Sequence, residues 1–302
     1  MKGKDVKYST LIATGCLSVI LLCSAYGSVG SKKAPEPITA ILGAFEKEIT
    51  LIEDQLTERQ ERSIEGIRFI SGKLSGTRAV IAWTGVGKVN TAMTTTLLIE
   101  HFEPKHVIFT GIAGAVNPEL EPGDIVIAQR TAYHDMGTVW PEGLFFKGVK
   151  SRLDGLENPV FFPADPELVK FAQVAAGRAD LQRVRTITGE RAPRIITGVV
   201  VTGDVFVASN EKCVELRKRL EADAVEMEGA AVAQICYQRR IGHLVIRSIS
   251  DKADEGAVLD KQMFYILAAK NSTDLVVEIV GLLGSEPSVG QSSNDKKSRD
   301  RK

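Results

Sequence analysis

The chain has 302 residues, of which 44% are hydrophobic and 25% are charged, and this balance excludes a largely disordered protein. Lysine plus arginine (38) equals aspartate plus glutamate (38), so no overall field attracts nucleic acid or a membrane surface, and we expect no nucleic-acid partner. The four cysteines fit neither a zinc-binding spacing nor a CxxC redox motif, so no metal site is predicted.

The N-terminal segment has the pattern of a signal peptide. Three lysines among the first seven residues precede an apolar run at residues 11–26. That run is about 16 residues long, shorter than the roughly 20 residues that span a membrane comfortably. Small residues just before position 28 predict cleavage after Gly27, and we expect the mature protein to be exported, either periplasmic or secreted. An uncleaved membrane anchor is the alternative, and membrane contact is expected only in that case.

Four segments make up the predicted domain organisation. Residues 1–27 are the signal peptide, residues 28–37 a linker with two lysines and two prolines, and residues 38–284 one α/β domain. Residues 285–302 are polar, serine-rich and basic at the end, and are predicted to be disordered. Removal of the signal peptide leaves Cys213 and Cys236, and the sequence leaves open whether they pair.

From residue 38 onward, apolar runs typical of strands alternate with segments of helical spacing. Strands are predicted at 38–45, 66–74, 78–84, 106–110, 124–131, 195–202, 220–225 and 243–249. Helices are predicted at 46–58, 87–101, 166–174, 210–220, 229–236 and 262–283. This alternation predicts a largely parallel or mixed sheet that helices cover on both faces.

Two glutamates lie where a buried strand runs into a helix. Glu226 and Glu228 are enclosed by apolar sequence, and a helix N-terminus favours an ionised carboxylate. A single glutamate at this place would most simply cap the helix. Burying a pair is costly unless the pair binds something, so we interpret the two residues as part of a ligand site.

Four loops that follow strands carry further unusual residues. They are residues 43–48, 85–88, 111–115 and 250–254. Because strand ends gather ligands in α/β sheets, we expect these loops to line one pocket. The second loop is not a phosphate-binding loop, since Ala82 and Val89 occupy the places of the required glycine and hydroxyl residue.

Eight segments resemble, in the same order, motifs of the 5′-methylthioadenosine/S-adenosylhomocysteine nucleosidases, a family of the nucleoside phosphorylase superfamily. They are residues 43–48, 84–89, 110–114, 122–126, 133–135, 202–206, 225–228 and 247–251. The resemblance implies a three-layer α/β/α sandwich with a central mixed sheet, a homodimer, and no metal or other cofactor. It also implies a hydrolase that cleaves adenine from nucleosides with a 5′-thio substituent, namely 5′-methylthioadenosine and S-adenosylhomocysteine.

The resemblance assigns three catalytic residues. Asp251 matches the general acid that helps to protonate N7 of adenine, and Glu48 matches the residue that activates the attacking water. Glu228 matches the ligand of the ribose hydroxyls. An apolar approach and the nearby acids Glu48 and Glu228 are expected to raise the pKa of Asp251. Without the resemblance, Asp251 would be read as a solvated loop acid and Glu48 as an ordinary helix-start glutamate.

The resemblance also assigns the substrate-binding residues. Phe206 is expected to stack on adenine, with the backbone of Val207 reading its edge, and Met227 and Arg247 are expected to line the ribose side. The other expected contacts are Phe45 and Val86, at the sugar and its 5′ substituent, together with Ala113, Gly114 and Ser250.

Two departures from the family pattern concern the pocket. Ile112 stands where some members have serine, which could loosen the hydrogen bonding around Asp251. The segment 136–164 is longer than in compact members and could reshape the 5′ subsite or the dimer contact.

Two alternative functions remain. A phosphorolytic enzyme needs cations for phosphate, whereas the first loop here carries Glu46 and Glu48, which repel it. A secreted, non-catalytic storage or nucleoside-binding protein would not need three carboxylates of the catalytic kind.

Overall fold

The computed structural model describes residues 36–153, 155–186 and 189–285. The predicted signal peptide, residues 28–35 of the predicted linker and residues 286–302 of the predicted tail lie outside the described residues. Within the described ranges, none of the helices combines the length and the apolar character needed to cross a membrane.

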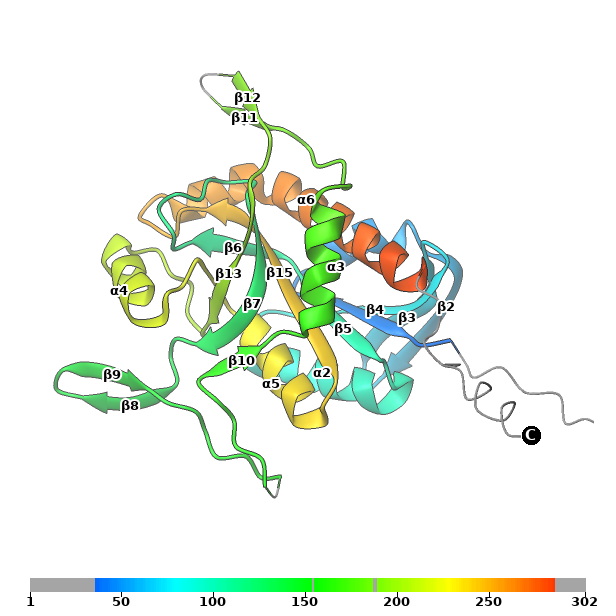
Figure 1. Ribbon diagram of the computed structural model, residues 1–302, viewed down its shortest axis with the longest axis horizontal. Helices are drawn as coiled ribbons and strands as arrows, with labels where there is room; N and C mark the ends of the chain where they lie inside the picture. The colour runs from blue at the N-terminus through cyan, green and yellow to red at the C-terminus, as the bar shows by residue number, and fades with distance from the viewer. Residues whose placement is uncertain (1–35, 154, 187–188, 286–302) are drawn as a thin grey trace, which may run out of the picture. The chain divides into compact units, whose positions relative to one another are not determined.

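Eleven strands form one mixed sheet in the order β10-β7-β13-β14-β6-β15-β5-β1-β4-β3-β2, and β8-β9 and β11-β12 form two separate hairpins (Figure 1). The strands are β1 (Thr39–Gly43), β2 (Thr57–Ile64), β3 (Ile67–Leu74), β4 (Thr77–Trp83), β5 (His106–Thr110), β6 (Ile112–Ala115), β7 (Ile125–Tyr133), β8 (Gly137–Trp140), β9 (Gly143–Phe146), β10 (Phe161–Pro163), β11 (Val184–Thr186), β12 (Gly189–Arg191), β13 (Ile195–Thr202), β14 (Ala224–Glu226) and β15 (Gly242–Asp251). The helices are α1 (Glu46–Glu53), α2 (Lys88–Phe102), α3 (Pro166–Ala176), α4 (Asn210–Leu220), α5 (Gly229–Arg239) and α6 (Ala257–Ser285).

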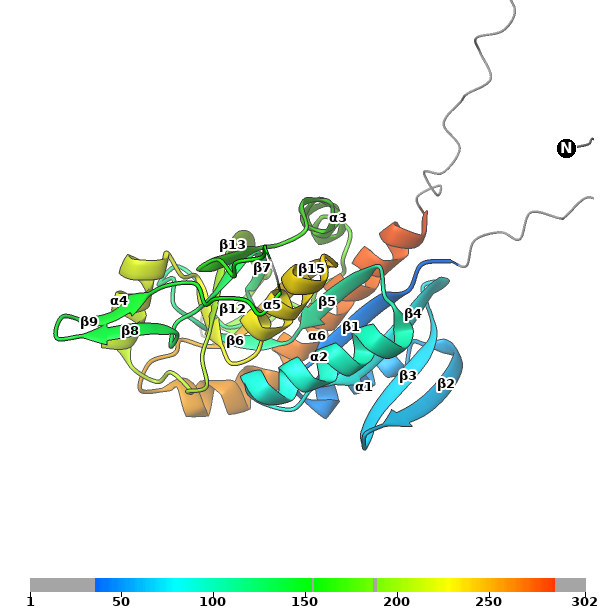
Figure 2. The same cartoon turned by 90° about the horizontal axis from the view of Figure 1, so that it is seen from below.

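The central strands are apolar on both faces because helices cover both. In β1, Ala40 and Leu42 join one hydrophobic cluster, while Ile41 points to the other side and joins a second. Helices α2 and α5 pack into the first cluster, and α1, α3 and α6 pack into the second (Figure 2). The predicted three-layer α/β/α sandwich with a mixed sheet is confirmed.

Five strands of the sheet close into a ring of pairings. Strand β7 pairs with β13 and also with β15, and the ring runs through β14 and β6. Strand β14 is antiparallel to β6, so its carboxyl end meets the beginning of β6, next to the carboxyl end of β5. The carboxyl ends of β5 and β14, which run in opposite directions, therefore meet at the start of β6. This arrangement brings the four predicted loops together.

The first predicted helix is too long. Helix α1 ends at Glu53, and residues 57–64 form β2, an edge strand whose first seven residues are exposed. Charged residues make up half of each segment, so the helical spacing of α1 continued by chance into residues 54–58. Charges on an edge strand also discourage pairing with other chains.

Other predicted elements also differ from the structure, among them the strand predicted at 220–225, which is β14 at Ala224–Glu226. Residues 112–115 were predicted as a turn but form β6, and β15 extends through Asp251 rather than ending at residue 249. Helix α6 begins at Ala257, five residues before the predicted start at 262, and ends at Ser285, which was assigned to the tail. The segment 136–164 contains the β8-β9 hairpin and β10, which pairs with β7. Both Cys213 and Cys236 are buried and unpaired.

Candidate active site

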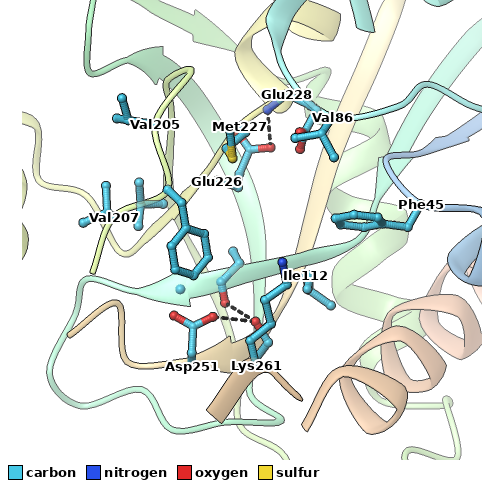
Figure 3. Close-up of a pocket in the computed structure, with 15 residues that line it drawn as sticks. Phe45, Val86, Ile112, Val205, Val207, Glu226, Met227, Glu228, Asp251 and Lys261 are labelled. Carbon is cyan, nitrogen blue, oxygen red and sulfur yellow. Dashed lines mark hydrogen bonds between the residues drawn. The ribbon is translucent and has the colours of Figure 1, made fainter. Parts of the chain in front are cut away.

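A pocket of about 350 Å³ lies where the strand ends converge, and Figure 3 shows its lining. The lining residues are Phe45, Val86, Ile112, Ala113, Gly114, Val205, Phe206, Val207, Val225, Glu226, Met227, Glu228, Ser250, Asp251 and Lys261. All predicted site residues except Glu48 and Arg247 are among them. No described residue of the segment 136–164 lines the pocket, so within this chain that segment does not reshape it.

Asp251 is the last residue of β15 and is only 2% exposed. Ser250 Oγ donates a hydrogen bond of 2.7 Å to its Oδ2, and the Ala253 N–H donates one of 2.9 Å to its Oδ1. Register places Asp251 opposite Gly114, where a Cβ atom would come within 2.7 Å of Oδ1. The glycine therefore makes room for the carboxylate.

Burial raises the pKa of Asp251, against the opposing effects of the Ser250 and Ala253 hydrogen bonds and the charge of Lys261. The direction agrees with the prediction, but the acid that adds to the rise is Asp260, not Glu48 or Glu228. Ile112 leaves no gap in the hydrogen bonding of Asp251, because Ser250 supplies a hydroxyl.

The sequence suggested that Glu226 and Glu228 together belong to a ligand site, but in the structure the two residues have different roles. Glu226 Oε2 accepts hydrogen bonds from Glu228 N (2.9 Å), Gly229 N (2.7 Å) and Arg247 Nη2 (2.6 Å). Its Oε1 accepts one from the Thr202 hydroxyl. With all of these donors, Glu226 fixes the entry to α5 and offers little to a ligand.

Glu228 occupies the N-cap position of α5, and its Oε1 accepts a hydrogen bond of 2.9 Å from the Gly87 N–H. Its Oε2 lies 3.9 Å from Arg247 Nη2. Burial, followed by the charge of Glu226, raises the pKa of Glu228. Burial and the second acid therefore act against the expectation that the helix N-terminus would keep this carboxylate easily ionised.

Arg247 does not line the pocket as predicted. Its side chain is 1% exposed, pairs with Glu226 and lies 4.1 Å from the centre of the Phe109 ring. Because it stands on β15 behind the two glutamates, it can act on a ligand only through them. We therefore regard Arg247 as a positioning residue.

Glu48 also lies behind the pocket surface. It is 1% exposed, and its Oε2 accepts hydrogen bonds from the N–H groups of Ala44 (2.9 Å) and Phe45 (3.1 Å). Its Oε1 is buried without a hydrogen-bond partner of normal geometry. Burial raises the pKa of Glu48, and Arg247 opposes the rise. An unpartnered, buried carboxylate oxygen is costly and indicates a place for a donor such as water.

Aromatic and apolar side chains form the walls of the pocket. Phe206 and Val86 are 45% and 40% exposed, as expected for groups at an open mouth, whereas Val207 is 8% exposed. Phe206 belongs to the loop between β13 and α4, and Phe45 precedes α1. A flat ligand can enter between these elements with Asp251 at one end and Glu228 at the other (Figure 3).

The sequence reasoning missed Lys261 as a pocket residue. The predicted helix began after it, whereas α6 begins at Ala257 and places Lys261 in its second turn, facing the pocket. Among the described residues that line the pocket, Lys261 is the single cation, and no arginine is available there for a phosphate. The described residues also contain no cluster of histidine, cysteine, aspartate or glutamate that could hold a metal ion.

Comparisons with known proteins agree with this geometry. The family model of the phosphorylase superfamily matches residues 38–281. The 5′-methylthioadenosine/S-adenosylhomocysteine nucleosidase of Geobacillus kaustophilus is 37% identical over 81% of this chain and 97% of its own length.

Solved structures give the same result. The nucleosidase of that name from Neisseria meningitidis, in complex with methylthio-immucillin-A, has a TM-score of 0.70 and 34% identity, covering 81% of this chain and 99% of its own. The futalosine hydrolase of Helicobacter pylori has a TM-score of 0.69 and 29% identity, covering 81% and 97%. The chain belongs to the phosphorylase superfamily and, within it, to the family of 5′-methylthioadenosine/S-adenosylhomocysteine nucleosidases.

Proposed function

We propose that this protein hydrolyses the bond between adenine and ribose in nucleosides with a 5′-thio substituent, 5′-methylthioadenosine and S-adenosylhomocysteine. The observation that carries the proposal is the placement of Asp251. A buried carboxyl group with a raised pKa lies at one end of a pocket whose other end holds a second carboxyl group, Glu228. In glycoside hydrolysis one carboxyl group commonly donates a proton to the leaving group while a second, here Glu48 behind the pocket surface, activates water.

Binding of the base is assigned to Phe206 and Val207. Phe206 offers a ring face at the mouth of the pocket, and stacking on a flat ring favours a purine. The backbone of the buried Val207 lies beside it and can read the edge of the base. This pose places N7 of adenine at Asp251 and the ribose hydroxyls at Glu228.

Departure of adenine is assigned to Asp251 as the general acid. The carboxyl proton passes to N7 while the bond between N9 and C1′ breaks, so adenine leaves as a neutral base. Burial raises the pKa of Asp251, which favours the protonated form that a general acid needs. Positive charge then develops on the ribose, and Glu228 stabilises it through hydrogen bonds to the sugar hydroxyls.

Attack by water is assigned to Glu48. Its unpartnered Oε1 accepts a hydrogen bond from the water, the water oxygen bonds to C1′, and the released proton passes to Glu48. The products are adenine and a ribose that keeps its 5-thio substituent. Proton exchange with solvent then removes the proton from Glu48 and returns one to Asp251.

The test is a substrate panel with purified protein: 5′-methylthioadenosine, S-adenosylhomocysteine, adenosine and inosine, each with and without phosphate. We expect adenine release from the two thio nucleosides at rates that phosphate does not change. Phosphorolysis is not favoured, because the lining offers a phosphate one lysine against three carboxyl groups. Formation of a sugar 1-phosphate in the phosphate arm would show that the hydrolase assignment is wrong.

Two properties of the whole chain are part of the proposal. A homodimer is supported by the family resemblance and by apolar side chains exposed on α2, Val89 (79%) and Met93 (49%). Export after cleavage following Gly27 is supported by the N-terminal pattern of lysines and apolar residues. N-terminal sequencing of the protein from its native cells should begin at Ser28, and an intact Met1 on protein from the cytosol would contradict export.

A further inference from the structure

Among the residues that the structure describes, Lys261 has no counter-ion, although the other ionisable residues that line the pocket are acids. Its Nζ lies 5.2 Å from the centre of the Phe45 ring and 5.3 Å from that of Phe206, and the residue is half-buried. Among the described residues, no carboxylate lies within ion-pair distance of it. In Figure 3, Lys261 reaches into the pocket from α6, between Asp251 and Phe45.

The charge of Lys261 has no use in the proposed reaction. It opposes the rise in the pKa of Asp251, and therefore makes the proton donor more acidic than burial alone would. The carboxylate of Glu226 already has Arg247 as its partner. Because Lys261 opposes the raised pKa of the proton donor and has no counter-ion among the described residues, we expect its partner to be a group of the ligand.

The position of Lys261 identifies the part of the ligand that it meets. In the proposed pose the base stacks on Phe206, while Phe45 flanks the sugar and its 5′ substituent. A base on the pocket side of Phe206 takes the space over that ring, and the ammonium group stays against Phe45. Lys261 then lies beside the 5′ substituent, where its positive charge would attract an anionic group.

We propose that Lys261 makes this site prefer adenine nucleosides whose 5′ substituent ends in a carboxylate over those whose substituent is a neutral alkylthio group. This inference rests on the proposed function. The shared chemistry is the carboxylate, whether it belongs to an amino acid, as in S-adenosylhomocysteine, or to a simple acid chain.

The test compares two nucleosides that differ in terminal charge, 5′-S-(3-carboxypropyl)thioadenosine and 5′-S-butylthioadenosine, with S-adenosylhomocysteine as a third arm. The measured quantity is the ratio of kcat/KM for the carboxylate to kcat/KM for the neutral compound. In Lys261→Met, which keeps the length and apolar stem of the side chain, we expect this ratio to fall about tenfold. That is the lower end of what a hydrogen bond to a charged group contributes.

Three controls define the outcome. Lys261→Arg should keep most of the preference, and Lys218→Met, the same change on the exposed surface of α4, should keep all of it. The preference of the unmodified enzyme should decrease as ionic strength rises, which tests the charge even if the methionine variant does not fold. If S-adenosylhomocysteine behaves like the neutral compound while the carboxypropyl compound is preferred, the amino group cancels the effect and the preference is for simple acids.

Failure of this inference differs from failure of the proposed function. Hydrolysis of both test compounds with a ratio that neither Lys261→Met nor salt changes would overturn the role of Lys261 and leave the nucleosidase assignment intact. If no thio nucleoside releases adenine, the proposed function itself is wrong.

Discussion

Asp251 shows how burial and hydrogen bonding set the chemistry of one residue. Desolvation favours the neutral acid, while Ser250 and the Ala253 N–H hold the carboxyl group in one orientation. An aspartate in solvent would be ionised at neutral pH and could not donate a proton. The chemistry of Asp251 therefore depends on its buried, hydrogen-bonded position at the end of β15 as much as on the residue type.

Replacing the acid by its amide tests this role. In Asp251→Asn the side chain keeps its size and can donate a hydrogen bond to N7, but it cannot transfer a proton. General acid catalysis contributes about 10²- to 10⁴-fold. We therefore expect kcat with 5′-methylthioadenosine to fall by about 10²-fold or more. Binding of a non-hydrolysable analogue, measured by calorimetry, should weaken far less because Phe206 and Glu228 remain.

Asp254→Asn makes the same change three residues away, outside the lining of the pocket, and serves as the control. A variant of Asp251 that keeps more than about a tenth of the original kcat would remove the residue from the general-acid role.

The raised pKa of Asp251 also predicts a pH dependence of stability. Between the ordinary value of 3.8 and the higher pKa in the folded protein, the folded state holds a proton that the unfolded state has lost. Its contribution is therefore fully present below the unfolded pKa and is lost as pH rises through the folded pKa. Glu48 and Glu228, whose pKa values burial also raises, act in the same direction.

In Asp251→Asn the contribution of Asp251 to the pH dependence of stability disappears. The free energy of unfolding, measured by denaturant titration at a series of pH values, should fall less steeply with rising pH than in the unmodified protein. Equal slopes for the two proteins would contradict a raised pKa at Asp251.

At the residue level the sequence predicted which side chains gather at the site but not which way each one faces. Glu48 and Arg247 were assigned through the family resemblance, and the structure places both behind the pocket surface. The direction in which the Arg247 side chain points depends on the register of β15 and on the ion pair with Glu226. Neither of these can be read from a short motif. Lys261 carries no motif at all.

At the scale of elements, one ion-pair network joins three segments around the mouth of the pocket. Lys88 Nζ, at the start of α2, lies 2.7 Å from an oxygen of Asp135 and 3.5 Å from one of Asp204. The backbone of Asp204 also donates to Asp135 (2.9 Å), and the backbone of Lys88 donates to Asp204 (2.8 Å). This network anchors the loop that carries Phe206.

Lys88→Met leaves Asp135 and Asp204 without their cation and should loosen that loop. We expect KM for 5′-methylthioadenosine to rise about fivefold, corresponding to about 1 kcal/mol, with a smaller change in kcat because Asp251 is untouched. Lys212→Met removes a comparable pair on α4, with Glu215, and should leave KM unchanged. Equal effects of the two variants on KM would argue against the anchoring role.

The elements that the sequence predicted well are those in which buried and exposed residues recur with a clear helical or strand period. Helix α4 was predicted with both ends correct, since a serine cap starts it and a strongly periodic surface follows. Strands β2 and β6 were missed for opposite reasons. The first is a charged edge, and the second is only four small or apolar residues whose pairing with β14 and β15 depends on distant segments.

At the scale of the whole molecule, the proposed homodimer makes a direct prediction. Light scattering after gel filtration should give twice the mass of one chain. Val89→Asp combined with Met93→Asp places two charges on the exposed face of α2 and should shift the protein toward the monomer. Val174→Asp, on α3 at the opposite face of the sheet, should not. A single-chain mass for the unmodified protein at micromolar concentration would contradict the dimer.

The central claim is that water attacks the anomeric carbon, and the fate of the water oxygen tests it most directly. The protein is incubated with 5′-methylthioadenosine in ¹⁸O-labelled water that also contains phosphate, and the sugar product is analysed by mass spectrometry before the label can exchange. We expect 5-methylthioribose that carries the label at C1, with no phosphorylated sugar. Unlabelled sugar 1-phosphate as the main product, or no release of adenine at all, would contradict the account.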